Sequence, residues 1–114
     1  LHTNLRSDMS ADVFQDNFRE LVKPITEEDE VILMCDILGG SPMTKAREVL
    51  AEKNLLDKSL ILTGMNMPMV MTAVIMKDNI DDRNTLKEII LNEARNAITE
   101  FVVETPAEDS DDDI

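Results

Sequence analysis

One stretch decides the fold of this chain: Val31-Ile32-Leu33-Met34-Cys35-Asp36-Ile37-Leu38-Gly39-Gly40-Ser41-Pro42. Its apolar run, 31–34, has no polar alternation, which is typical of a central strand of a parallel sheet covered on both faces. Asp36 follows at the carboxyl end of that strand. Two glycines then permit a tight turn, and Ser41 as N-cap with Pro42 as first helical residue begins a helix. The stretch therefore predicts a strand, a turn and a helix.

The turn and the helix start form a candidate anion site. Gly39 and Gly40 let the backbone approach a ligand closely, while free N–H groups and the positive end of the helix dipole point toward whatever lies beside Asp36. A phosphoryl group fits this description, because helix starts bind anions and open α/β sheets bind ligands outside the carboxyl ends of their strands. The same residues are also ordinary turn and capping chemistry, and their spacing alone leaves both interpretations open.

Apolar periodicity and capping residues place the other elements. A strand over 58–63 is expected to pair parallel to the first through a right-handed crossover. Ser10 is the expected N-cap of an early helix, and Thr85 forms a capping box with Glu88. The predicted helical stripes are Val13, Phe14, Phe18, Leu21 and Val22 before Pro24; Met43, Ala46, Val49 and Leu50 in a helix from Ser41 to about Asn54; and Leu86, Ile89, Ile90, Ala94, Ala97, Ile98 and Phe101 in a long final helix. The predicted class is α/β, with a mostly parallel sheet and helices on both faces in three layers.

The segment 67–76 is apolar almost all round and too short to span a bilayer. It is either a fully internal helix or a helix that lends one side to a subunit interface. We favour the interface, because a domain of this size has little interior to spare. Its methionines are suitable filler for such a surface.

Composition bounds the domain organisation and the partners. We expect one domain over 1–104 and an acidic disordered tail over 105–114. The formal charge of -13 argues against nucleic acid and anionic lipid as partners, and a protein that docks by charge should be basic. Cys35 is the single cysteine and is expected to pack in the core. The sequence shows no signal peptide, nucleotide-binding fingerprint or metal-ligand cluster, so we expect a cytoplasmic protein with no cofactor or metal.

Two motifs carry a family resemblance: Asp36-Ile37-Leu38-Gly39-Gly40-Ser41-Pro42 and, after the next apolar run, Thr63-Gly64-Met65-Asn66-Met67-Pro68-Met69. With them, roughly residues 1–101 resemble the mannose-family enzyme IIA of the bacterial sugar phosphotransferase system. The resemblance implies a homodimeric phosphocarrier that takes a phosphoryl group from HPr on a histidine nitrogen and passes it to enzyme IIB. Contact with the membrane would be only indirect, through the sugar permease.

The resemblance also implies roles for the motif residues. Asp36 would accept a hydrogen bond from one imidazole nitrogen, so that the other nitrogen is the nucleophile. Ser41, with backbone N–H groups of Gly39, Gly40 and the helix start, would hold the phosphoryl oxygens as negative charge accumulates. Asn66 and Pro68 belong to a loop that would face the substrate or the partner protein.

The nucleophile is where the sequence departs from the family. The family's histidine stands in a His-Gly turn after a first strand, whereas the single histidine here, His2, precedes Thr3 and falls where a second strand would be. We expect these residues to be the larger, C-terminal part of a longer protein whose active histidine is absent here, with His2 as the lesser candidate. Such a chain is expected to fold alongside the missing segment or in a swapped or distorted arrangement.

Three alternatives stay open. One is the subunit that donates phosphoryl groups to dihydroxyacetone kinase, which the sequence separates poorly from enzyme IIA. Another is a signalling receiver in which Asp36 itself is phosphorylated, although the paired acids and the lysine expected to hold magnesium and phosphate are not found. The third is a non-catalytic assembly module that uses the segment 67–76 as its interface.

Overall fold

A two-stranded parallel sheet lies at the centre of the computed structural model, which describes residue 3 and residues 9–103. The elements are α1 (Ala11–Leu21), β1 (Val31–Met34), α2 (Ser41–Glu52), the short 3-10 helix η1 (Leu56–Lys58), β2 (Ser59–Leu62), α3 (Met67–Met76) and α4 (Arg83–Asn96). Val31 lies opposite Ser59, and Met34 lies opposite Leu62. The predicted α/β class and the parallel pairing of these two strands are confirmed. His2 and the acidic tail lie outside the described residues.

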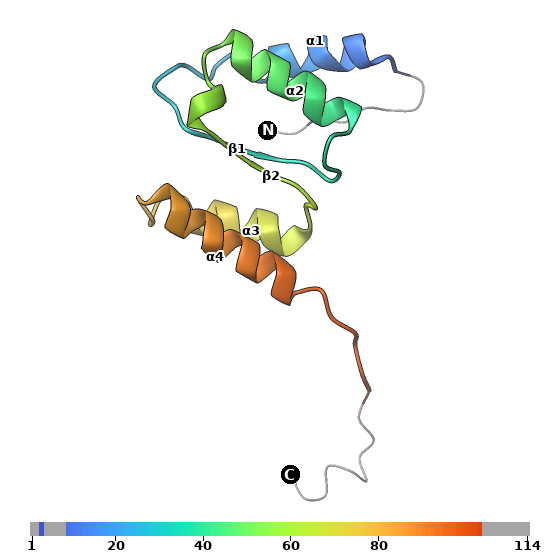
Figure 1. The fold of residues 1–114 in the computed structure, drawn as a ribbon, viewed down its shortest axis with the longest axis vertical. Coiled ribbons are helices and arrows are strands. Elements are labelled where there is room, and N and C mark those ends of the chain that lie inside the picture. The colour runs from blue at the N-terminus through green and yellow to red at the C-terminus, as the bar shows by residue number, and fades with distance from the viewer. Residues whose placement is uncertain (1–2, 4–8, 104–114) are drawn as a thin grey trace, which may run out of the picture.

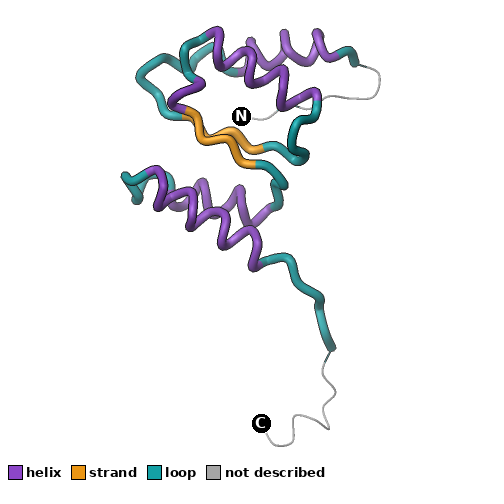
Figure 2. Tube along the Cα trace, in the orientation of Figure 1, coloured by secondary structure: helices purple, strands orange, loops and turns teal. Residues whose placement is uncertain are grey.

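The two faces of the sheet have separate hydrophobic cores. Helices α1 and α2 lie on one side of the strands, and α3 and α4 lie on the other (Figures 1 and 2). Val31 and Leu33 pack against a cluster on the first side, formed by Phe18, Val22, Ala46, Val49, Leu50 and Leu55. Ile32 and Met34 pack against the second, formed by Leu62, Met69, Ala73, Leu86, Ile90 and Ala94. Because both faces of β1 are covered, its sequence does not alternate.

The pair α1 and α2 agrees closely with the predicted stripes. Ser10 caps α1 by accepting a hydrogen bond from the Val13 N–H at 3.1 Å, as predicted. Phe14 and Phe18 are buried and stack with ring centroids 6.3 Å apart. Val13 was wrongly assigned to the buried stripe: its side chain is 48% exposed, because it projects beside the stripe that faces α2. All four residues predicted for the buried face of α2 are buried.

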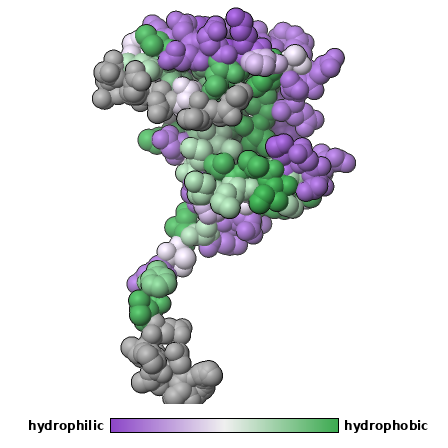
Figure 3. Space-filling view, turned by 180° about the vertical axis from the view of Figure 1, so that it is seen from behind, coloured by the Kyte–Doolittle hydropathy of each residue, from purple (hydrophilic) through white to green (hydrophobic). Residues whose placement is uncertain are grey.

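Helix α3 has the predicted bounds and is buried on one side only. Met69 and Ala73 contact the second core, while Met67, Met71, Val74 and Ile75 are between 54% and 68% exposed. The fully internal alternative is therefore wrong for this structure. From behind, where α3 is on the near side, apolar surface gathers over the middle of the lower helix pair with hydrophilic surface at its edges, whereas the top of the molecule, over α1 and α2, is mostly hydrophilic (Figure 3).

Helix α4 begins earlier and ends earlier than predicted. Its N-cap is Asp82, whose carboxylate accepts hydrogen bonds from the Thr85 backbone and hydroxyl, so Thr85 lies inside the helix. The Arg83 side chain donates to the carbonyls of Asp57 and Ser59, which fixes the first turn of α4 beside the start of β2. The helix ends at Asn96, and Phe101 is 87% exposed beyond it.

Candidate functional site

The two sequence motifs meet at one edge of the sheet. The Cys35 N–H donates to the Leu62 carbonyl at 2.8 Å, and the Met65 N–H donates to the Cys35 carbonyl at 2.9 Å. These bonds continue the strand pairing past the ends of β1 and β2, so the loop after Cys35 lies beside the loop after Leu62. Asp36 is exposed at this edge, where open α/β sheets bind ligands.

The turn from Asp36 to α2 uses one of its two glycines for an unusual backbone angle. Gly39 has a φ of +76°, as the sequence predicts for this turn, whereas Gly40 has an ordinary φ of -70°. A Cβ atom at Gly40 would lie 3.9 Å from the Ile37 Cβ, so the chain folds back on itself here. The amino end of α2 consequently lies against the residue that follows Asp36.

The N-cap of α2 is Gly40, and the prediction of Ser41 as N-cap is wrong. Gly40 is extended, with ψ at 166°, and its carbonyl already accepts the Thr44 N–H at 3.0 Å, which is the first bond of the helix. Ser41 is therefore the first helical residue and Pro42 the second. Glycine has no capping side chain, and no other described side chain caps this helix. The Ser41 side chain is exposed at the first turn.

The start of α3 has a side-chain cap, whereas the start of α2 has none among the described residues. The Asn66 side-chain oxygen accepts the Met69 N–H at 3.0 Å, so Asn66 is the N-cap of α3. Its side-chain nitrogen donates to the Ala94 carbonyl, also at 3.0 Å, and so ties this loop to the end of α4. Pro68, like Pro42, is the second helical residue and is half-buried. Of the two neighbouring helix starts, only that of α2 lacks a side-chain cap among the described residues.

Cys35 lies next to the candidate site but is poorly suited to be a nucleophile. Burial, and then the neighbouring Asp36 carboxylate, raise the pKa of the Cys35 thiol above its usual value. A raised pKa lowers the fraction of thiolate, which is the reactive form. Cys35 is half-buried and belongs to neither hydrophobic core, so the prediction that it packs in the core is wrong. Its backbone instead joins the two loops.

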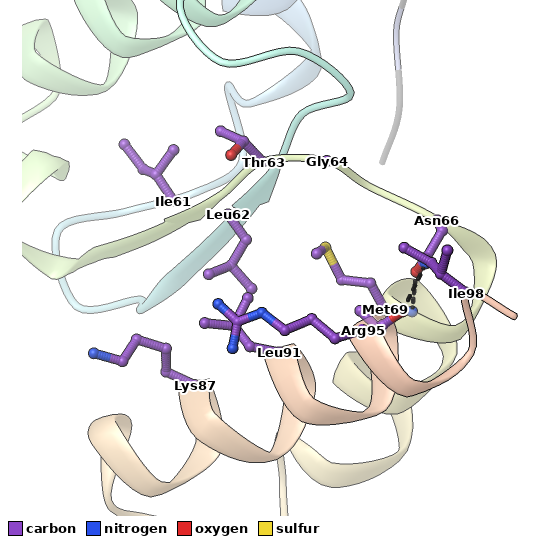
Figure 4. Close-up of a pocket in the computed structure, with 11 residues that line it drawn as sticks. Ile61, Leu62, Thr63, Gly64, Asn66, Met69, Lys87, Leu91, Arg95 and Ile98 are labelled. Carbon is purple, nitrogen blue, oxygen red and sulfur yellow. Dashed lines mark hydrogen bonds between the residues drawn. The ribbon is translucent and has the colours of Figure 1, made fainter.

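A cavity of about 370 Å³ lies on the other side of the second motif, between β2, the start of α3 and α4 (Figure 4). Leu62, Leu91 and Met69 contribute apolar walls, and the side chains of Lys87 and Arg95 extend along it. Neither of these two cations belongs to a predicted site or motif. Their spacing with Leu91, four residues on either side, is the signal that places them on one helical stripe. Asp36 and Ser41 do not line this cavity.

The described residues do not gather a metal site. Within this part of the chain, no three His, Cys, Asp or Glu side chains are close enough together to hold a metal ion. No described helix is long and apolar enough to cross a membrane.

Comparisons with known proteins agree on one family. Residues 2–91 match the family model EIIA-man, described as the PTS system fructose IIA component. The PTS system fructose-specific EIIA component of Bacillus subtilis (strain 168) is 28% identical over 78 residues, which cover 68% of this chain and 49% of that protein. This chain thus spans about half the length of that relative. The crystal structure of phosphotransferase system component EIIA from Streptococcus agalactiae superposes with a TM-score of 0.66 at 21% identity, covering 82% of this chain and 69% of that one. That likeness supports the fold.

Proposed function

The chain belongs to the EIIA-man family of phosphotransferase-system IIA components, and from this premise we propose that it relays phosphoryl groups between proteins as an enzyme IIA. It would be a phosphotransferase that receives the group from HPr on a histidine and passes it to enzyme IIB. The observation that supports this most is the open start of α2 beside Asp36, at the edge where the two motifs meet. We infer a cytoplasmic protein that reaches a sugar permease only through enzyme IIB.

Each part of the site has a chemical task in this proposal. Asp36 accepts a hydrogen bond from one nitrogen of the imidazole, which leaves the other nitrogen free to attack and favours the cationic ring that forms. Ser41 and the N–H groups at the start of α2, which have no partner among the described residues, hold the phosphoryl oxygens, with the positive end of the helix dipole behind them. Pro42 has no N–H to contribute. The task of Asn66 and Pro68 is to hold the adjacent loop in the shape that meets the partner protein.

The proposal places the phosphorylated imidazole outside the described residues. His2, the single histidine of the chain, is not among them. We infer that the described residues supply the carboxylate and anion-binding half of the pocket, and that a histidine outside the described residues supplies the other half. Residues 1–104 would form this phosphocarrier domain, with 105–114 as an acidic tail.

A homodimer is the oligomeric state that fits the exposed face of α3. Met67, Met71, Val74 and Ile75 form a contiguous apolar surface on one side of this helix. Large exposed apolar patches mark interaction surfaces, and methionine adapts to them readily. A second copy of the chain covering this face would bury those side chains.

The test is a phosphorylation assay on the full-length protein with phosphoenolpyruvate, enzyme I and HPr. We expect a label that is lost in acid and survives alkali, as a phosphohistidine does, and that passes on to enzyme IIB. A label lost in alkali would indicate an aspartyl phosphate, and no label would favour an assembly module. Transfer to a dihydroxyacetone kinase subunit in place of enzyme IIB would reassign the partner.

Asp36→Asn tests the role of the carboxylate in the same assay. Because the amide cannot fix the imidazole in the reactive tautomer, the variant is expected to transfer about a hundredfold more slowly. Asp81→Asn is the matched control, an exposed aspartate in the loop before α4, and should transfer at the wild-type rate. Equal rates for the two variants would exclude Asp36 from the site.

A further inference from the structure

The loop between β1 and α2 has few anchors in the described structure. On its strand side, the backbone of Cys35 is bonded to Leu62 and Met65. The next apolar side chains give little support, because Ile37 is 66% exposed and Leu38 is 74% exposed. On its helix side, the Gly39 N–H donates to the Met43 sulfur at 3.2 Å. Met43 therefore ties the far end of the loop to α2.

Met43 is placed to hold this bond firmly. It is the third helical residue of α2, and its side chain is only 9% exposed. In a capping box, a glutamate or glutamine at this same helical position reaches back to a backbone N–H at the start of the helix. Here a thioether, a weak acceptor, makes an equivalent bond one residue further back. The burial of the methionine restricts where the sulfur can lie, and the bond then restricts where Gly39 can lie.

The second helix start provides a natural comparison. Met69 occupies the third helical position of α3, again directly after a proline, and is 2% exposed. There the loop is held by Asn66, whose side chain bonds to Met69 N–H and to Ala94. Among the described hydrogen bonds, none ends on the Met69 sulfur. The two buried methionines thus share position and burial but differ in whether the sulfur holds a loop.

We propose that Met43 is a positioning residue for phosphoryl transfer. Its sulfur holds Gly39, and through Gly39 it holds Asp36 and the start of α2 in the arrangement that receives the phosphoryl group. Because this bond occupies the Gly39 N–H, the phosphoryl oxygens would accept hydrogen bonds from the donors of the following residues. This inference rests on the proposed enzyme IIA function. It gives a functional role to Met43, which the sequence pattern predicts only as a buried residue of the helix.

Three variants of the full-length protein separate the sulfur from the packing. Met43→Leu keeps an apolar side chain and removes the acceptor, so the rate constant for transfer from phosphorylated HPr should fall about two- to tenfold, with KM unchanged. Met43→Gln supplies a carbonyl oxygen at the same position, as in a capping box, and should recover most of that loss. Met69→Leu is the matched control and should transfer at the wild-type rate. Unfolding midpoints measured alongside report any effect on packing.

The outcomes are distinct. A slow Met43→Leu, a recovered Met43→Gln and an unaffected Met69→Leu support the inference. Wild-type rates in Met43→Leu overturn it, as does a Met43→Gln that is no faster than Met43→Leu, since either result leaves Met43 a packing role only. An equal loss in Met69→Leu overturns it too. If the wild-type protein accepts no phosphoryl group, the proposed function fails, and the inference fails with it.

Discussion

The Ser41 hydroxyl makes no hydrogen bond to the described residues, because a glycine takes over the capping of α2. A serine at the N-cap accepts a hydrogen bond from the backbone two or three residues ahead. Such a serine would be occupied within its own helix and less available to a ligand. In this structure Gly40 is the N-cap, and Ser41 is the exposed first helical residue beside the Asp36 turn. Capping and phosphoryl binding therefore do not compete for the same side chain.

Ser41→Ala should separate function from stability. Loss of one donor to a developing anion typically slows a reaction about 10²- to 10³-fold, and we expect a loss of that order in phosphoryl transfer. The free energy of unfolding should change by less than about 0.5 kcal/mol, since no cap is lost. Ser10→Ala is the opposite control: it removes a real N-cap, should cost about 1 kcal/mol of stability and should leave transfer unchanged. If Ser41→Ala were destabilised but transferred phosphoryl groups normally, Ser41 would be a helix cap and not a phosphoryl-binding residue.

At the scale of elements, a capping residue correctly predicts the start of α1, where Ser10 is the N-cap. Asp82 and Thr85 are both good caps three residues apart, so local sequence cannot choose between them. The contacts of Arg83 with Asp57 and Ser59 favour the earlier start, and these carbonyls are remote in sequence. The end of α4 is equally hard to predict from local sequence, because no glycine or proline follows Asn96 until Pro106.

The cap at Asp82 makes α4 sensitive to acid. The Thr85 hydroxyl, and then the Thr85 N–H, lower the pKa of Asp82 below its usual value. A lowered pKa in the folded state means that the stabilisation is complete above the ordinary carboxyl pKa and is lost as the pH falls through the folded value. Urea midpoints of wild type and Asp82→Ala should therefore differ at neutral pH and converge in acid. Asp81→Ala, at an exposed position in the preceding loop, should keep the wild-type urea midpoint at neutral pH. A difference that persists unchanged into acid would contradict this assignment.

At the scale of the whole molecule, the sequence predicts that both faces of the first strand are buried. It predicts less well which helices cover each face. The unalternating run 31–34 correctly implies cover on both faces, and the two cores supply it. The candidate site was predictable because its residues are contiguous in two motifs. The cavity bearing Lys87 and Arg95 was not, since it forms only when α4 packs beside β2. The exposure of half of α3 likewise depends on how α4 lies against it.

The exposed face of α3 predicts a self-associating protein. Met71→Asp places a charge in this surface and should convert a dimer into monomers, because burying an unpaired carboxylate is costly. Sedimentation equilibrium of the full-length protein measures this directly. Val13→Asp, an equally simple change at an exposed apolar position of α1, should leave the mass unchanged. A wild-type protein that is monomeric at high concentration would refute the homodimer.

Amide NMR spectra of the full-length protein before and after phosphorylation would show which helix start holds the phosphoryl group. If the start of α2 holds the phosphoryl oxygens, the N–H resonances of Ser41 and Met43 should move strongly downfield. Those of Met67 and Met69, at the capped start of α3, should move much less. Large shifts at α3 with none at α2, in a protein that does become phosphorylated, would show that the open helix start beside Asp36 is not the phosphoryl site.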